Sequence, residues 1–350
     1  MQPTVTVICS VCGGEAFETI CTALEIEAQH AYLCRFHRRR LRPDAPRLAL
    51  EERAEFTQDY ATNIDACPDC GLLLRNPRPS REQIRKAYQQ DDYGPERLAA
   101  LFPSQLELYR PKARRLARRL PRGARVVEVG SFVGGFLAAG QECGWEVLGF
   151  DPGEEVDAFC AARHLPVFRG ALPDAPVPAG SVDCVAIWNT FDQLPDPAPT
   201  LAAAQRLLKP GGLLALRVPN GACFRAYLTG YRRCRHTGLR FVRGGLLRAL
   251  AWNNLLTFPY LYGYSAPTLD RLLMRYGLAR EAVQGDTLVR LADAQTRRWA
   301  AWEERLVKLS CRLALSLEGA LRPRNPYTLA PWLDAYYRKS RDQGSLPRNG

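Results

Sequence analysis

Four cysteines near the start of the chain have a spacing that suits a metal ion. They form two C-x-x-C-G turns, with Cys9 and Cys12 in "ICSVCGG" and Cys67 and Cys70 in "ACPDCGL". Each turn can hold two thiolates about 2.3 Å from a zinc ion, and a site of four thiolates has no open position for chemistry. The pattern therefore predicts a structural Zn²⁺ bound by these four cysteines.

The segment between the two turns is longer than in an ordinary zinc ribbon. It contains an Arg-rich stretch with helical character, "FHRRRLRPDAPRLALEERAEF". The entropy cost of closing a loop grows only with the logarithm of its length, so such an insert is tolerated. Cys21, Cys34, His30 and His37 lie in this segment and could replace a ligand or form a second site. Two other interpretations stay open: reduced free cysteines, and a redox pair, which is disfavoured because neither turn opens a helix after a strand.

The stretch "VVEVGSFVGGFLAAG", residues 126–140, has the order of a nucleotide-binding loop: a buried strand, a glycine-bearing turn and the start of a helix. Gly130 begins the turn, and the acids Glu128 and Asp151 end this strand and the next one. An acid at the end of the second strand can accept hydrogen bonds from ribose hydroxyls. The G-x-G-x-x-G fingerprint of dinucleotide sites is absent, and Phe132 stands where a second glycine is common. These features predict a site for an adenosine ligand without a pyrophosphate.

The elements around this loop alternate between strands and helices. Strands are predicted for residues 124–130, 145–152, 166–170, 181–190 and 213–220, with helices between them. After a break at residues 221–264, a helix at 266–278, a strand at 279–291, a long helix at 295–321 and a last strand at 330–340 follow. This order predicts an α/β fold: a Rossmann-like, seven-stranded, mostly parallel sheet with helices on both faces. A small zinc-ribbon-like module would precede it, and a helical insert would interrupt it.

In this order the segments resemble a class I S-adenosylmethionine-dependent methyltransferase over residues 105–290. The resemblance rests on "VVEVGSFVGGFL", "VLGFDP", "SVDCVAIWNTFDQLPDP" and above all "LLKPGGLLALRVPN". The two cysteine turns, followed by "LLLRNPRP" and "KAYQQDDYG", are similar to the zinc-binding leader of one group of these enzymes. That group includes sugar C-methyltransferases and natural-product methyltransferases.

The resemblance implies S-adenosylmethionine as cofactor and assigns residues to it. Glu128 would order the methionine end, Gly130 and Gly134 would allow close approach, and Asp151 would hold the ribose hydroxyls. The full expected set is Glu128, Gly130, Ser131, Phe132, Gly134, Asp151, Pro152, Ala171, Leu172, Trp188, Asn189 and Thr190. Two positions depart from the family pattern: Phe132 replaces a glycine, and Gln193 stands where many relatives have a histidine that could act as a base.

An oxygen or carbon nucleophile usually needs a general base to accept its proton. The candidates are His236, Tyr262 and Tyr264, with Asp192 and His164 as further possibilities. The first three lie in or at the end of residues 221–264, an aromatic and basic segment that we interpret as a substrate lid. Its arginines could bind a phosphorylated or carboxylated substrate, or could contact anionic lipid or RNA.

The composition indicates the kind of partner but does not identify a substrate. The chain has 350 residues and a net charge of +12, which suits an anionic partner. Only five of its 48 basic residues are lysines, which is also typical of high-GC coding. We predict a zinc module with its linker at residues 1–100 and a methyltransferase domain at 101–340. The chain lacks an 18-residue apolar run and a signal-peptide pattern, so a cytoplasmic protein is expected.

Three functions remain open from the sequence. The first is methylation of oxygen or carbon on a small molecule or glycan, for which the basic composition favours an anionic one. The second is RNA methylation by way of the zinc module and the basic surface, which the absence of an N-P-P-[FYW] loop disfavours. The third is a catalytically silent cofactor-binding protein, in view of Phe132 and Gln193.

Overall fold

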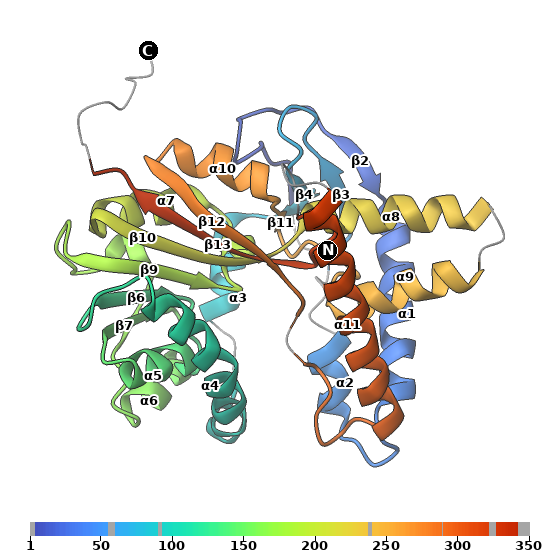
Figure 1. Cartoon of the computed structure of the whole chain (residues 1–350), viewed down its shortest axis with the longest axis horizontal. Coiled ribbons are helices and arrows are strands. Elements are labelled where there is room, and N and C mark those ends of the chain that lie inside the picture. The colour runs from blue at the N-terminus through green and yellow to red at the C-terminus, as the bar shows by residue number, and fades with distance from the viewer. Residues whose placement is uncertain are drawn as a thin grey trace. The chain divides into compact units, whose positions relative to one another are not determined.

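The computed structural model describes residues 4–54, 60–89, 93–236, 240–288, 290–321 and 327–341 (Figure 1). The chain divides into two compact units. Unit 1 contains residues 1–79, 218–269 and 284–334, and unit 2 contains residues 80–217, 270–283 and 335–350. The predicted domain boundary at residue 100 stays a prediction. Each compact unit consists of three separate segments of the chain.

A seven-stranded sheet confirms the predicted α/β class. Its strands lie in the order β12-β13-β10-β9-β6-β7-β8. The pairs β10/β9, β9/β6, β6/β7 and β7/β8 are parallel. The bounds are β6 Arg125–Val129, β7 Glu146–Asp151, β8 Val167–Arg169, β9 Val182–Trp188, β10 Leu208–Pro219, β12 Leu278–Asp286 and β13 Trp332–Lys339. The chain direction across the sheet reverses between β6 and β9, and open α/β sheets bind ligands at such a switch point.

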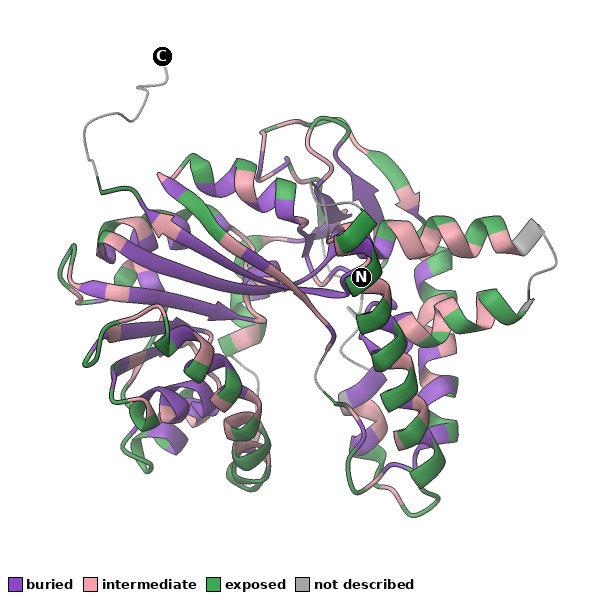
Figure 2. Ribbon diagram, in the orientation of Figure 1, coloured by how far each residue is buried: buried purple, intermediate pink, exposed green. Residues whose placement is uncertain are grey.

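Helices follow the strands as the sequence predicts. They are α3 Arg81–Gln89, α4 Pro95–Ala117, α5 Gly135–Glu142, α6 Glu154–Ala161, α7 Pro197–Leu207 and α10 Ala266–Met274, with single 3₁₀ turns η1 Leu172–Asp174 and η2 Phe191–Gln193. Phe136 of α5 packs edge-on against Tyr109 of α4 and against Trp188 of β9. These side chains belong to one buried cluster, which fixes the helices against the strands that carry the loop. The central strands β13, β10, β9 and β6 are drawn largely as buried in Figure 2, whereas the edge strand β12 is largely not.

Unit 1 contains a second, smaller sheet that the sequence did not predict. Its order is β11-β4-β3-β2, with antiparallel pairing throughout. The strands are β2 Glu18–Cys21, β3 Asn63–Ala66, β4 Leu73–Asn76 and β11 Tyr262–Gly263. A separate pair joins β1 Thr4–Val5 to β5 Arg78–Pro79. The segment that we interpreted as a lid thus ends in a strand that pairs with the cysteine-bearing hairpin.

The helices of unit 1 include α1 Ala23–Arg40, α2 Arg47–Ala54, α8 Gly221–His236, α9 Arg240–Trp252 and α11 Arg298–Leu321. Thr22 and Glu25 form a capping box that begins α1. One buried cluster joins three stretches of chain through Phe36 of α1, Trp252 of α9 and Ala300 of α11. None of the helices in the described part of the chain is both long and apolar enough to cross a lipid bilayer.

Candidate cofactor and metal sites

The loop between β6 and α5 depends on two glycines. Gly130 and Gly134 both have φ of +72°, a conformation that side chains disfavour. A Cβ atom on Gly130 would lie 2.3 Å from Thr190 Oγ1, and one on Gly134 would lie 2.7 Å from Leu165 Cδ1. Thr190 follows β9, so the loops at the carboxyl ends of β6 and β9 are in direct contact at the switch point.

Phe132 occupies the tip of this loop with φ of +45°. Its backbone N–H donates a hydrogen bond of 2.9 Å to Asp151 Oδ2, while Gly153 N–H donates one of 3.0 Å to Asp151 Oδ1. The ring packs edge-on against Tyr93, with centroids 5.0 Å apart. Phe132 is therefore an ordered part of the loop, and its amide orients the acid that is expected to hold the ribose.

Glu128 lies in the middle of the sheet beneath the loop. Its side chain is 2% exposed, and among the described residues no donor reaches Glu128 Oε2. Burial, followed by the nearby charge of Asp151, raises the pKa of Glu128 well above its usual range. A buried acid without a partner is costly, and a cationic ligand group would relieve this cost. These residues fit the positively charged amino-acid end and the ribose of S-adenosylmethionine.

The other expected contacts surround the same edge of the sheet. Ser131 is buried, and within the described part of the chain its hydroxyl has no hydrogen-bond partner. Pro152 is half-buried after β7. Ala171 is exposed and Leu172 is buried where η1 begins, just after β8. All four positions follow parallel strands at their carboxyl ends, as the sequence predicts for a ligand site.

The end of β9 differs in detail from the expectation. Trp188 belongs to the expected cofactor contacts, but its side chain is 1% exposed and packs on Phe136 with centroids 5.5 Å apart. Asn189 is half-buried with φ of +56°. Its Nδ2 donates a hydrogen bond of 3.3 Å to Tyr109 Oη. Asn189 and Thr190, and not the ring of Trp188, therefore border the loop.

Gln193 takes part in two hydrogen bonds where many relatives have a histidine. Its Nε2 donates to the Asn189 carbonyl at 2.7 Å, and its Oε1 accepts from Tyr88 Oη of α3 at 3.0 Å. An amide suits this position because it donates and accepts at the same time. Gln193 thus fixes the loop after β9 and is not a proton acceptor.

Asp192, next to Gln193, is a buried carboxyl group in the loop after β9. It is 4% exposed, and no described residue bonds its Oδ1. Burial raises the pKa of Asp192 to about 7. Because this carboxyl follows β9 at the switch point, it is placed in the same loop as Asn189 and Thr190.

The remaining candidate bases have other surroundings. Tyr262 is 2% exposed and its hydroxyl accepts a hydrogen bond of 2.5 Å from Arg78 Nη2. Tyr264 is fully buried beside it, with ring centroids 5.8 Å apart. Both belong to unit 1. His236 is the last residue of α8, and its side chain lies outside the described residues. His164 is exposed in the turn between α6 and β8.

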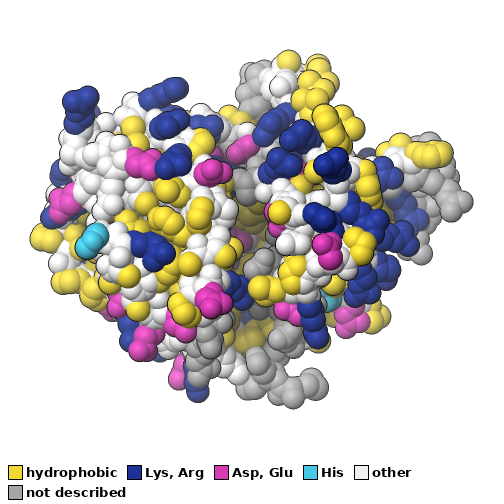
Figure 3. Space-filling model, turned by 90° about the horizontal axis from the view of Figure 1, so that it is seen from below, with side chains coloured by type: hydrophobic (Ala, Val, Ile, Leu, Met, Phe, Trp, Pro, Cys, Tyr) yellow, Lys and Arg dark blue, Asp and Glu magenta, His cyan; other side chains and the backbone are white. Residues whose placement is uncertain are grey.

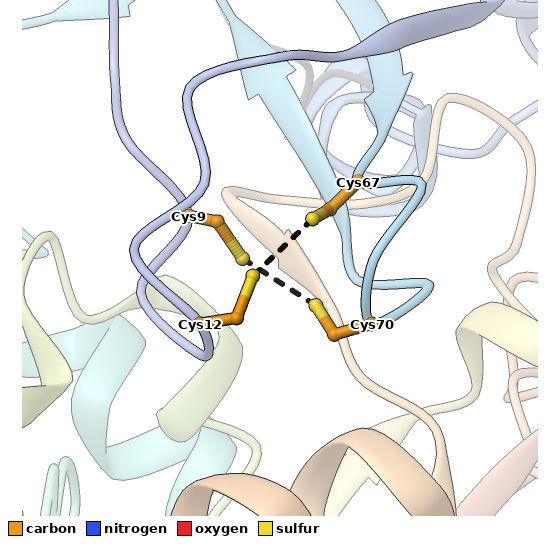
Figure 4. Close-up of side chains that lie close together, drawn as sticks. All are labelled: Cys9, Cys12, Cys67 and Cys70. Atoms are coloured by element: carbon orange, nitrogen blue, oxygen red, sulfur yellow. Dashed lines mark hydrogen bonds between the residues drawn. The ribbon is translucent and has the colours of Figure 1, made fainter.

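The four cysteine side chains converge in unit 1 (Figure 4). Their sulfur atoms all lie within 4.8 Å of one another. The distance is 3.5 Å between Cys9 Sγ and Cys70 Sγ and 3.4 Å between Cys12 Sγ and Cys67 Sγ. A regular tetrahedron of four Zn–S bonds has edges of about 3.8 Å. The donor set and its size therefore fit Zn²⁺.

The two cysteine turns have the same backbone geometry. Gly13 and Gly71 both have φ of +79°, and each N–H donates a 2.8 Å hydrogen bond to the carbonyl of the first cysteine of its turn. The second turn closes the hairpin in which Ala66 of β3 pairs with Leu73 of β4. Burial raises the pKa of Cys9 to about 11, so a bound cation would have to displace its proton.

The spare ligand types do not join this cluster in the described part of the chain. Cys21 is buried in β2. His30 Nε2 and Cys34 Sγ are 3.3 Å apart on α1. His37 is fully buried between the rings of Phe36 and Trp252. Burial, with the charges of Arg53 and Arg40, lowers the pKa of His37 to about 3, which makes it a neutral core residue.

Unit 1 also contains a pocket that sequence reasoning missed. It has a volume of about 610 Å³ between α1, α8 and α9. Apolar side chains line it, among them Phe224, Leu228 and Leu250, together with Arg35, Arg232 and Arg243. Arg232 is paired with Glu25 at 3.0 Å, and Arg243 donates to Tyr231 Oη at 2.8 Å. Arg35 forms no ion pair with any described residue, so the pocket combines an apolar wall with unneutralised positive charge.

A second pocket of about 580 Å³ lies in unit 2, lined by Gln141, His164 and Val167 among others. It lies at the amino ends of β7 and β8, the sheet edge opposite the loops. It is therefore not the cofactor site.

Comparison with known proteins agrees with this geometry. Among curated relatives, a probable S-adenosylmethionine-dependent methyltransferase from Mycolicibacterium smegmatis is 31% identical over 112 residues, 31% of this chain and 43% of that protein. An uncharacterized 37.1 kDa protein in a transposon of Streptomyces fradiae is 33% identical over 91 residues, 25% of this chain and 26% of that protein. The matches thus span less than half the length of either relative.

Solved structures with a similar chain course include a putative methyltransferase in complex with the Haloferax volcanii Trm112 activator, with TM-score 0.45 and 18% identity, covering 73% of this chain and 97% of that one. Another is a possible histamine N-methyltransferase from Thermotoga maritima, with TM-score 0.43 and 16% identity, covering 70% and 94%.

A family model described as a methyltransferase domain matches residues 102–283. The matched segment contains the loop, both acids and β6 to β10. Because it is more than half of the chain, the protein belongs to the methyltransferase domain family and has the class I S-adenosylmethionine-dependent fold that the sequence resembles.

Proposed function

We propose that this protein transfers a methyl group from S-adenosylmethionine to a small, anionic acceptor molecule. The observation that carries the proposal is the pair of acids at the switch point, Glu128 buried beneath the loop and Asp151 oriented by the Phe132 amide. When bound, the cofactor supplies an electrophilic methyl group on a positively charged sulfur. The protein then has to position the acceptor and remove its proton.

Each residue of the site has a distinct task in this proposal. Glu128 balances the positive charge of the methionine end, and Asp151 binds the ribose. Asp192 accepts the proton of the acceptor, since a pKa of about 7 leaves much of it ionised near neutral pH. It replaces the histidine of related enzymes as the base, while Gln193 holds the same loop in place. His236, Tyr262 and Tyr264 stay candidates from the sequence alone.

The pocket of unit 1 suits an anionic ligand with an apolar part. Its volume of about 610 Å³ lies within the range of ordinary small-molecule sites. Arg35 would pair with a carboxylate or phosphate, and Phe224 and Leu228 would contact the apolar part. Structural Zn²⁺ at the four cysteines would hold the hairpin β3/β4. The proposed base agrees with methylation of an oxygen or carbon atom, because such a nucleophile usually needs a general base.

RNA methylation is the second candidate. The net charge of +12 favours it, and Lys and Arg side chains gather on part of the face shown in Figure 3. The residues after β9, Asn189-Thr190-Phe191-Asp192, disfavour methylation of a base amine. RNA binding with a steep dependence on salt would favour this candidate over the first.

Calorimetry with S-adenosylmethionine and S-adenosylhomocysteine is the first test. We expect both to bind with a stoichiometry of one per chain, and no binding of either would refute both catalytic proposals. A screen of carboxylated, phosphorylated and nucleotide-sugar compounds for release of S-adenosylhomocysteine then identifies the acceptor. Arg35→Gln should weaken binding of an anionic ligand to the pocket of unit 1, whereas Arg39→Gln, which removes an exposed arginine of the same helix outside the pocket, should not.

A further inference from the structure

Helix α11 exposes the side chains that a surface helix normally buries. Seven large hydrophobic residues on it are between 50% and 79% exposed: Trp299, Trp302, Leu306, Leu309, Leu313, Leu317 and Leu321. At 100° per residue they occupy one stripe about 120° wide along about 36 Å of helix. The side of α11 that faces the viewer is drawn largely as exposed in Figure 2. An apolar stripe of this length marks an interaction surface.

The opposite face of α11 is buried within unit 1 and carries three charged side chains, Glu304, Lys308 and Glu318. Glu304 accepts hydrogen bonds from the N–H groups of Leu291 and Ala292 at 2.6 and 2.8 Å, and also pairs with Lys308. Glu318 accepts from the N–H groups of Thr328 and Leu329 at 3.0 and 2.8 Å. These acids hold two loops against the helix. The buried face of α11 therefore packs within unit 1, and its apolar face is exposed.

A row of arginines accompanies the stripe on one side. Arg298, Arg305 and Arg312 are exposed and recur every seven residues. None of the three forms an ion pair with a described residue, and Arg305 stacks on Trp302 at 5.1 Å from the ring centroid. The third acid of the helix, Glu303, is engaged by Arg40 at 2.6 Å and by Trp252 at 3.1 Å. The exposed side of α11 thus carries apolar and positively charged groups without a free acid.

We propose that α11 binds the surface of an anionic lipid membrane, with its axis in the plane of the interface. An interfacial helix of this kind inserts its apolar face to a depth of about 5–10 Å and places basic side chains against anionic headgroups. Trp299 and Trp302 have the amphipathic rings that occur at the headgroup level. The proposal is independent of the proposed methyl transfer, because it concerns a face of unit 1 and not the cofactor loop.

A second copy of the chain is the competing occupant. Residues 299, 302, 306, 309 and 313 have the alternating three- and four-residue spacing of a coiled coil. In an antiparallel pair, the arginine rows of the two helices would face each other. In a parallel pair, Arg305 would face Ser310 of the second helix and Arg312 would face its Leu317. Glu303 would not pair with these arginines because it is already bound to Arg40. After Leu313 the exposed leucines, Leu317 and Leu321, follow at intervals of four residues, and this spacing widens the stripe. The charges thus favour an anionic surface over a copy of α11.

Vesicle flotation tests the proposal with the full chain. The probes are vesicles of phosphatidylcholine alone and vesicles with about 30 mol% phosphatidylglycerol, an anionic content that creates a substantial surface potential. We expect binding to the anionic vesicles, weakened by salt, and little binding to the neutral ones. Leu306→Glu should weaken this binding at least about tenfold, and the double variant Arg305→Gln/Arg312→Gln should weaken it several-fold.

Leu24→Glu is the matched control, since Leu24 is a 76% exposed leucine on α1 of the same unit. It should leave vesicle binding unchanged. Far-ultraviolet circular dichroism verifies that each variant is folded. Absence of binding by the folded wild-type protein at low salt, or equal binding by Leu306→Glu, would overturn the proposal. Sedimentation that reveals a dimer dissociated by Leu306→Glu, with no vesicle binding, would assign the stripe to a second copy instead.

Discussion

The backbone amide of Phe132 donates a hydrogen bond of 2.9 Å to the carboxylate of Asp151. This contact joins the least typical residue of the cofactor loop to the residue on which ribose binding is expected to depend. The side chain that departs from the family pattern packs against Tyr93, while the backbone N–H of the same residue donates a hydrogen bond that any residue except proline could donate. The departure therefore changes the packing of the loop and preserves its hydrogen bonding.

Asp151→Ala should weaken S-adenosylmethionine binding by about 10- to 100-fold, because hydrogen bonds to a charged group contribute about 1.5–3 kcal/mol. Asp151→Asn can still accept from the Phe132 amide but has no charge, so an intermediate affinity is expected. Calorimetry measures both variants. Asp157→Ala, which removes an acid of α6 in the same unit, is the control, and equal affinities for Asp151→Ala and wild type would refute the ribose assignment.

Phe132→Gly and Phe132→Ala separate the backbone of this residue from its ring. Both variants lose the contact with Tyr93, but only alanine retains the cost of a left-handed conformation, about 1 kcal/mol. We therefore expect Phe132→Gly to be the more stable of the two in urea unfolding. Both should still bind S-adenosylmethionine within about threefold of wild type, a factor of less than 1 kcal/mol. Loss of binding in Phe132→Gly would mean that the ring itself contacts the cofactor.

Asp192 should make both activity and stability depend on pH. Its pKa is raised from 3.8 to about 7 in the folded protein, so the folded state retains the proton over a range in which the unfolded state has lost it. Stability due to this group is therefore lost as the pH rises from about 4 to about 7. Methyl transfer should increase over the upper part of this range as the base becomes ionised.

Asp192→Asn removes this ionisation. Its free energy of unfolding should exceed that of wild type at pH 8 by up to about 4 kcal/mol, and the difference should vanish near pH 4. Its activity should be low and no longer rise near pH 7, while cofactor affinity is retained. Chemical unfolding at several pH values, together with a pH–rate profile, checks both effects. A variant with wild-type activity would exclude Asp192 as the base.

Mass spectrometry of the purified protein should find close to one zinc ion per chain. Cys12→Ser should lose the metal and lower the melting temperature, because binding of structural zinc contributes to folding free energy. Cys21→Ser is the matched control: it alters a buried cysteine of the same unit outside the cluster and should retain zinc. Zinc retained at the wild-type level in Cys12→Ser would contradict the four-cysteine site.

The strands and helices of the seven-stranded sheet could be predicted because each is long enough to show its period. Residues 126–140 and 181–190 illustrate this, since the structure has β6, α5 and β9 there. The beginning of α4 at Pro95 was predicted as a linker, because two prolines and a polar composition obscure the helical spacing. The predicted strand at 213–220 begins five residues too late, since β10 starts at Leu208 and includes the segment "PGG" at an irregular register.

Other features could not be predicted because they depend on contacts between distant parts of the chain. Strand β11 has two residues and pairs with β4 across about 190 positions of sequence, so no local pattern identifies it. The burial of Trp188 depends on the packing of α5 over β9. The hydrogen bonds of Gln193 require α3 to reach the loop through Tyr88. In each case the sequence gives the residue type, but it does not show which distant residue that side chain contacts.

The small sheet of unit 1 has a consequence for how this protein can be divided. Strand β4 beside the second cysteine turn and strand β11 at the end of residues 221–264 hydrogen-bond to each other, and Phe36 and Trp252 share one core. A truncated protein that begins at residue 101 would retain all of residues 102–283, which the family model matches. It would nevertheless expose the side chains of α8 and α9 that are buried in the core shared with α1. Trimming, grafting or exchanging the leader between relatives therefore requires moving residues 218–269 with it.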